Sequence, residues 1–223
     1  GTALKSFDNI KFNTSETIYF SKTAFVGTEL ENIMLYQSGD FLLEQDGISD
    51  PIVKQVVNPN TEVITITSEH TRFAKDVFKN CNRLKFVQFR GSIVDWAKLT
   101  FENEYANPLC KPGVILATEE VPGKIDVHVN WEQSTQRFTK INKYVFINQT
   151  IGQLSLFGTD VADSAFYKCT IKTLYTTPSI LAATKAKLPD NCITNIFFDE
   201  GETYFPDSLL AGFTSLTTVN IPW

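Results

Sequence analysis

The feature that most constrains this chain is an apolar pattern that returns along its length. In FKNCNRLKFVQF, residues 78–89, Phe78 is followed at +6, +9 and +11 by Leu84, Val87 and Phe89. Leu210 begins a second stretch with apolar residues at the same three offsets. We therefore interpret 78–89 as one copy of a repeat, not as an isolated strand.

Other copies use a version that is one residue shorter, with apolar residues at +5, +8 and +10. They begin at Phe25, Phe146, Phe166 and Leu188, with a weaker copy at Val56 and a clipped copy formed by Phe7, Ile10 and Phe12. The last four anchor residues, at 146, 166, 188 and 210, are separated by 20, 22 and 22 residues. A fixed period in the low twenties is typical of stacked repeat proteins.

The offsets predict a short strand in each copy. Its last two apolar residues alternate with period two, so both point to the same side. The anchor Phe or Leu would return on the opposite wall of the coil. A single coil cannot bury its apolar face, whereas coils stacked about 4.8 Å apart form a parallel sheet with a continuous core. The alternative is an antiparallel sandwich, but units of this length with one asymmetric motif favour the solenoid.

The repeats resemble the BspA-like leucine-rich repeats, whose unit reads roughly A-F-x-x-C-x-x-L-x-x-I-x-I-P. The match is carried by Ala24-Phe25, Phe78 with Cys81, Ala165-Phe166 with Cys169, and Ile221-Pro222. The stretch 92–109 resembles a variant unit of that family through Trp96, Leu99, Phe101, Asn107, Pro108 and Leu109. The resemblance covers 75–223 well and 1–74 loosely. It implies a right-handed solenoid with a parallel sheet on its concave face and an irregular or short-helical convex side.

We predict a single leucine-rich-repeat domain over 1–223. Two segments interrupt the period. In 36–55, turn signals flank FLLE, which predicts a protruding β-hairpin. Residues 92–130 hold the variant units, with 114–129 as their hairpin-like extension and Lys124, Val127 and Val129 as a candidate strand.

Charge and cysteine content exclude several functions. The net charge is −5 and no basic block occurs, so we expect no nucleic-acid partner. The four cysteines contain no CxxC pair, which argues against a zinc knuckle or a thioredoxin-type site. We expect them to be buried free thiols. No run approaches the roughly 18 apolar residues that span a membrane.

No motif indicates catalysis. The two histidines, His70 and His128, have no motif neighbours, and no G-x-S-x-G, H-E-x-x-H or P-loop pattern occurs. The acidic pairs Glu119-Glu120 and Asp199-Glu200 are interpreted as solvated turns. We expect no enzyme, no catalytic residue, no metal site and no cofactor.

Binding is the better prediction, because outward residues of consecutive strands form columns on the concave face of a solenoid. The columns contain an unusual number of aromatic residues. The candidate binding residues are Tyr36, Phe86, Phe157, Tyr175 and Phe197. Clustered exposed aromatics suggest an interaction patch. The alternative is that neighbouring loops cover them as a secondary core.

The resemblance implies a function class, since the family is typical of surface-exposed or secreted bacterial proteins and of some protist surface proteins. We expect a cell-surface or extracellular module that binds a protein ligand through its concave face, in adhesion or host and matrix interaction. The alternatives are spacer repeats that present other domains, or a carbohydrate-binding accessory protein. Gly1 fits the scar of a removed tag, so we expect a targeting segment to have been trimmed. Membrane attachment is expected only through a lipid anchor lost with that segment.

Overall fold

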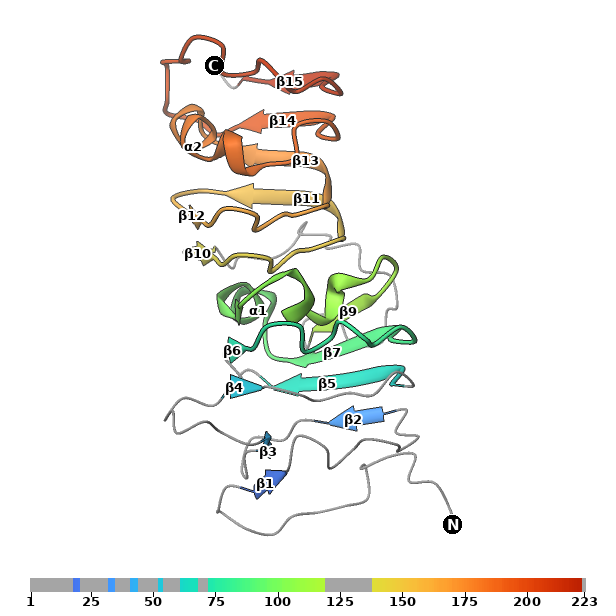
Figure 1. Cartoon of the computed structure of the whole chain (residues 1–223). Helices are drawn as coiled ribbons and strands as arrows, with labels where there is room; N and C mark the ends of the chain where they lie inside the picture. The colour runs from blue at the N-terminus through green and yellow to red at the C-terminus, as the bar shows by residue number, and fades with distance from the viewer. Residues whose placement is uncertain are drawn as a thin grey trace. The chain divides into compact units, whose positions relative to one another are not determined.

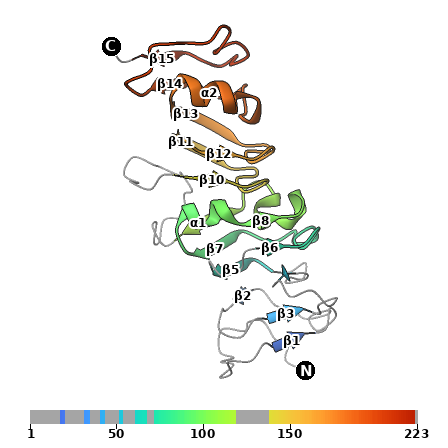
Figure 2. The same cartoon turned by 90° about the vertical axis from the view of Figure 1, so that its left-hand side faces the viewer.

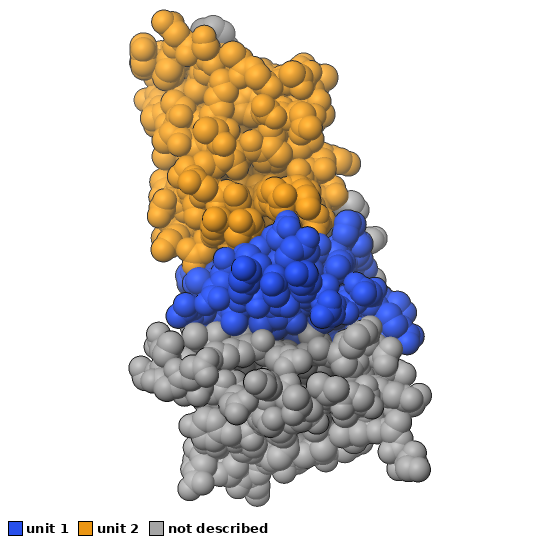
Figure 3. All heavy atoms as spheres, in the orientation of Figure 1, with its two compact units in different colours: residues 1–125 blue, residues 126–223 orange. Residues whose placement is uncertain are grey.

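The computed structural model describes residues 61–67, 72–118 and 138–221, together with the backbone of four short strands nearer the N-terminus. These strands are β1 (Ile18–Phe20), β2 (Asn32–Met34), β3 (Phe41–Leu43) and β4 (Ile52–Val53) (Figure 1). The chain divides into two compact units, residues 1–125 and residues 126–223 (Figure 3). Each unit is described by itself.

Unit 1 contains a parallel sheet with the strand order β2-β5-β7-β9. The later three strands are β5 (Val63–Thr67), β7 (Phe86–Arg90) and β9 (Ile115–Thr118). Ile64 pairs with Val87, and Val87 with Leu116, so one inward position aligns across the strands. All three side chains are buried in the core. The predicted repeat register is therefore confirmed from the Val56 copy to the Phe78 copy.

Unit 2 contains a second parallel sheet, with the order β11-β13-β14-β15. Its strands are β11 (Thr150–Leu156), β13 (Thr170–Thr176), β14 (Asn195–Phe198) and β15 (Thr218–Asn220), which lie one above another in Figure 1. We call the second apolar residue after the anchor, at +8 or +9, the V position. The V-position residues of unit 2 pair in the order Leu154, Leu174, Ile196 and Val219. The predicted strand positions are confirmed here as well.

Each unit has a second, narrower wall that the repeat analysis did not predict. In unit 1 it is the parallel sheet β4-β6-β8, with β6 (Arg72–Phe73) and β8 (Thr100–Phe101). In unit 2 it is the pair β10 (Lys140–Ile141) and β12 (Asp160–Val161). Phe73, Ile141 and Val161 are buried, and each lies five residues before an anchor Phe. That recurring apolar residue was the signal for this wall.

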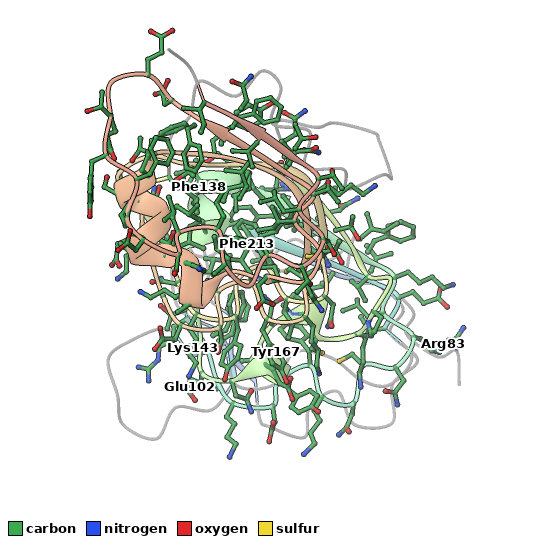
Figure 4. The ribbon with its side chains drawn as sticks, turned by 90° about the horizontal axis from the view of Figure 1, so that it is seen from above. Arg83, Glu102, Phe138, Lys143, Tyr167 and Phe213 are labelled. Atoms are coloured by element: carbon green, nitrogen blue, oxygen red, sulfur yellow. The ribbon has the colours of Figure 1, made fainter. Side chains whose placement is uncertain are left out.

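In each unit we call the first sheet described above the wide sheet and the second the narrow wall. The chain passes from the narrow wall to the wide sheet through a tight turn that contains the anchor. The residue two positions before the anchor has a positive φ in four coils, namely Asp76, Tyr144, Ser164 and Ser208, with φ between 58° and 64°. The anchors Phe146 and Phe166 stack with ring centroids 5.9 Å apart. Seen from above, Phe138 and Phe213 lie inside the winding ribbon (Figure 4). Stacked apolar rings therefore fill the space between the two walls.

Short helices occur in the coils, as the sequence predicts, while the assignment of a convex side stays a prediction. They are α1 (Ile93–Lys98) in unit 1 and α2 (Pro178–Thr184) in unit 2, with 3-10 turns at Glu104–Ala106, Pro108–Cys110 and Lys185–Lys187 (Figure 2). Ser92 and Asp95 form a reciprocal capping box that starts α1. No helix among the described residues is long and apolar enough to cross a membrane.

The variant unit packs around a buried tryptophan. Trp96 is fully buried, with its ring 5.2 Å from Phe89 and 5.7 Å from Phe101. The side chain of buried Asn107 accepts a hydrogen bond of 2.8 Å from the Leu109 amide. The asparagine is therefore a cap for the following 3-10 turn, which explains why this motif needs it.

The structure contradicts the hairpin predicted in 36–55 and the start of the extension predicted over 114–129. The FLL strand at the centre of 36–55 pairs in parallel with Ile18–Phe20, whereas a hairpin arm would pair antiparallel with a neighbour in sequence. At the start of 114–129, Ile115–Thr118 pairs in parallel with Phe86–Phe89 as a strand of the wide sheet, so this part is not an extension. In both cases stacking onto the existing ladder satisfies backbone groups that a protruding hairpin would leave to solvent.

Several predictions fall outside the described residues: the Phe7 copy, Tyr36, His70, Glu119-Glu120, the candidate strand at 124–129 with His128, and Pro222. The single-domain prediction also stays a prediction, because the two units are described separately.

Candidate interaction surfaces

The wide sheet of unit 2 turns every second side chain away from the core. Its central outward row is Ser155, Tyr175, Phe197 and Asn220, each paired with the next across the strands. The rings of Tyr175 and Phe197 stack with centroids 5.0 Å apart and planes inclined by 21°. Both side chains are half-buried. The predicted neighbours are thus brought together as one stacked pair, which we call the Tyr175–Phe197 stack.

Uncharged polar groups border this stack. The adjacent outward row is Gln153, Thr173, Asn195 and Thr218. The Asn195 side-chain amide donates to the Thr173 hydroxyl at 3.2 Å, so side chains of neighbouring coils hold each other in place. Phe157, which directly follows β11, is half-buried as well. An apolar ring pair beside hydroxyl and amide groups can bind an uncharged surface.

In unit 1 the outward face has a different character. Phe86 is half-buried and pairs with Val63 on one side and Ile115 on the other, and both neighbours are also half-buried. A fully buried Phe86 would have contradicted the predicted register, so the register holds at this coil. The next outward row holds Thr65, Gln88 and Ala117, with the Thr65 hydroxyl 3.1 Å from the Gln88 side-chain oxygen.

Sequence reasoning found Phe86 but missed its two partners. Val63 and Ile115 occupy the position directly before the buried V-position residue, which the repeat analysis left untreated except at Phe86. Comparing that position across coils would have shown three apolar side chains in a row. We call this set, Val63, Phe86 and Ile115, the Phe86 row.

A charged cluster flanks the Phe86 row. Glu62 forms ion pairs with Arg83 at 2.7 Å and with Lys85 at 2.9 Å. The hydrogen bond from Lys85, with further help from Arg83, lowers the pKa of Glu62 below its ordinary value. Arg83 lies on the outside of the ribbon in Figure 4. An apolar row with a charged rim is the usual arrangement of a protein-binding surface.

A comparison with protein families identifies the repeat. The family model described as "BspA type Leucine rich repeat region" matches six copies, over residues 55–107 and 131–223, which is well over half of the chain. The chain belongs to the BspA-type leucine-rich repeat family. No curated protein and no solved structure matches the chain.

The BspA-type repeats give the cysteines a structural place. Cys110 donates from its thiol to the Phe78 carbonyl at 3.7 Å, and Cys169 donates to the Phe146 carbonyl. Each thiol thereby ties its coil to an anchor of an earlier coil. Burial raises the pKa of Cys81 to about 12, of Cys110 to about 11 and of Cys169 to about 12. All four cysteines are free and all but Cys192 are buried, which confirms that prediction for three of them.

Leucine-rich repeats of this type are generally not catalytic. Within 61–67, 72–118 and 138–221, no group of three or more His, Cys, Asp or Glu side chains is placed to hold a metal ion. The high thiol pKa values also leave Cys81, Cys110 and Cys169 almost entirely protonated at neutral pH, and the protonated thiol is a poor nucleophile.

Proposed function

We propose that this protein is a cell-surface or secreted binding module that recognises a protein ligand through the outward faces of its wide sheets. The observation that carries the proposal is the Tyr175–Phe197 stack, two aromatic rings from successive coils on the outward face of unit 2. Family membership supports an interaction module, and we propose adhesion to host or matrix proteins as its role.

The physical argument concerns desolvation. Aromatic residues are enriched among the few interface residues that carry most of the binding free energy. A stacked pair is already ordered, so binding costs little side-chain entropy. The Phe86 row offers a second apolar surface on unit 1, where the rim of Glu62, Arg83 and Lys85 adds charge for specificity. Each of the two surfaces, taken by itself, has the chemistry of a protein-binding surface.

The test is a pull-down from extracellular-matrix and cell-surface extracts with three proteins. They are the wild type, the double variant Tyr175→Ala/Phe197→Ala, and the control Tyr167→Ala, which removes an exposed ring from a turn. We expect the double variant to lose the captured protein and the control to retain it, with all three showing the same circular dichroism. Capture that is equal in the wild type and the folded double variant would refute the stack as the binding surface.

A carbohydrate ligand is the second candidate. The row of Gln153, Thr173, Asn195 and Thr218 provides only uncharged hydrogen-bonding groups beside the rings, which suits sugar hydroxyls. An array of neutral glycans, screened with the same three proteins, separates the two candidates. Binding of a neutral oligosaccharide that disappears in the double variant would favour the carbohydrate, and no binding on the array would favour the protein ligand.

A further inference from the structure

The segment between β14 and β15 carries a second candidate contact, separate from the outward sheet face. Residues 199–207 read DEGETYFPD, with four acidic residues and no basic one. Tyr204 is 74% exposed, far more than any other large apolar side chain of the described residues. Single exposed apolar residues are common on protein surfaces, but a tyrosine ring this exposed is open to contact by a partner.

The segment is held on both sides of Tyr204. Before it, the Glu202 carboxylate accepts hydrogen bonds from the Ser179 amide at 2.9 Å and from the Ser179 hydroxyl at 2.5 Å, which ties the segment to the first turn of α2. After it, the Phe205 ring packs edge-on against Phe198, with centroids 5.0 Å apart and planes at 90°. Tyr204 is thus fixed between two attachment points while its own ring stays in solvent.

The backbone supports the same arrangement. Gly201 has φ +107°, a conformation that L side chains rarely adopt, and a Cβ there would meet no atom within 4 Å. The glycine is therefore required by the path of the loop and not by crowding. This turn directs the chain back to α2, where Glu202 binds.

The charged residues of the loop on either side of Tyr204 are all acidic. Asp199, Glu200 and Asp207 are exposed, and no lysine or arginine of the described part of the chain lies within ion-pair distance of them. The nearby Lys185 is engaged, because its ammonium donates to the Ser208 carbonyl at 2.8 Å and lies 5.7 Å from the Phe213 ring centroid. The ring face of a tyrosine attracts cations, and the carboxylates strengthen that preference.

We propose that the 199–207 loop docks a basic segment of a partner protein, with an arginine or lysine of that segment over the Tyr204 ring. The fixed, exposed ring is the contact, and the carboxylates select the sign of the partner's charge. A pre-ordered ring costs the complex little conformational entropy. This surface is distinct from the Tyr175–Phe197 stack, so it does not depend on the function proposed for that stack.

The test uses fluorescein-labelled peptides of alternating Arg and Gly, and of alternating Glu and Gly, titrated with the whole protein and followed by fluorescence anisotropy. We expect the wild type to bind the arginine peptide at low salt and not the glutamate peptide. Tyr204→Ala should weaken binding by about two- to fivefold, the range of an exposed cation–π contact. Tyr204→Phe should bind like the wild type, since it keeps the ring.

Three further variants make the result specific. The triple variant Asp199→Asn/Glu200→Gln/Asp207→Asn should weaken binding and flatten its salt dependence, because fewer charges are then screened. Tyr167→Ala, the matched control on a turn of the same unit, and the double variant of the stack should both bind like the wild type. The proposal is overturned if Tyr204→Ala binds the arginine peptide as tightly as the wild type, or if the wild type does not bind it.

Discussion

At the scale of single residues, the cysteines give a direct prediction about reactivity. Burial raises the pKa values of Cys81, Cys110 and Cys169 to about 12, 11 and 12, while Cys192 is half-buried. Because the thiolate is the reactive form, we expect iodoacetamide at pH 8 to label Cys192 first in the folded protein. Mass spectrometry of the labelled peptides measures this. All four should react in denaturant, and early native labelling of Cys81 would contradict the buried assignment.

Glu202 gives a residue-scale prediction about pH. The hydrogen bond from the Ser179 side chain is the main cause that lowers its pKa below the ordinary value of 4.5. A carboxylate with a lowered pKa contributes its stabilisation above the ordinary value and loses it as the pH falls through the lowered value. We therefore expect the loop 199–207 to loosen below about pH 4.5.

Hydrogen–deuterium exchange of the loop peptide, corrected for the intrinsic pH dependence, is the measurement. Ser179→Ala should show the faster exchange already at neutral pH, and Ser215→Ala, a serine of the next turn, should not. An unchanged loop in Ser179→Ala would show that the hydrogen bond does not hold it.

At the scale of elements, the turns before the anchors contain local strain. Ser164 has φ +59°, and residues other than Gly, Asn and Asp adopt this region at a cost of about 1–2 kcal/mol. Ser164→Gly removes that cost. It also raises the conformational entropy of the unfolded chain, which lowers the free energy of unfolding by about 0.4–1 kcal/mol. We expect a net stabilisation of about 0–1.6 kcal/mol in urea unfolding. Ser164→Val should be destabilising, and a more stable valine variant would contradict the assignment.

The same scale shows what the sequence could and could not predict. The strands of the wide sheets could be predicted from the offsets. Each strand has two apolar residues separated by one position, such as Val87 and Phe89, and only one register buries both of them. The two-residue strands of the narrow walls were missed. In a pair such as Lys140–Ile141, a single buried residue shows no alternation, so only comparison between coils reveals it.

The hairpin at 36–55 failed for a related reason. The turn residues around FLLE indicate that the chain bends there, but they do not indicate which strand the FLLE segment pairs with. Phe41–Leu43 pairs with Ile18–Phe20, and that long-range choice depends on a ladder that local sequence cannot show. The candidate site was partly predictable on the same grounds. The register gave Tyr175 and Phe197 as neighbours, whereas the fixed position of Tyr204 depends on the contacts of Glu202 and Phe205.

At the scale of the whole molecule, stability should be distributed coil by coil. In a stacked repeat each coil gains most of its stabilisation from the coils on either side. The V-position column of unit 2 shows this: Leu154, Leu174 and Ile196 are at most 1% exposed, but Val219 of β15 is 38% exposed. The described part of β15 pairs only with β14. Exchange protection should therefore fall from β13 to β15.

The column also allows a matched comparison between two positions with the same register. Ile196→Ala removes a side chain buried between two strands and should cost about 2–5 kcal/mol, as such core truncations do. Val219→Ala removes a smaller and partly solvated side chain and should cost less than about 1 kcal/mol, because little apolar area returns to water. Urea unfolding followed by circular dichroism measures both.

The unequal costs follow only if stacking, and not the intrinsic strand propensity of each residue, stabilises the sheet. Propensity alone would make the two truncations similar, since both replace a β-branched residue in a strand. Thr218→Ala, on the outward face next to Val219, is the control and should change stability by less than about 0.5 kcal/mol. Equal losses at Ile196 and Val219 would contradict the stacking account.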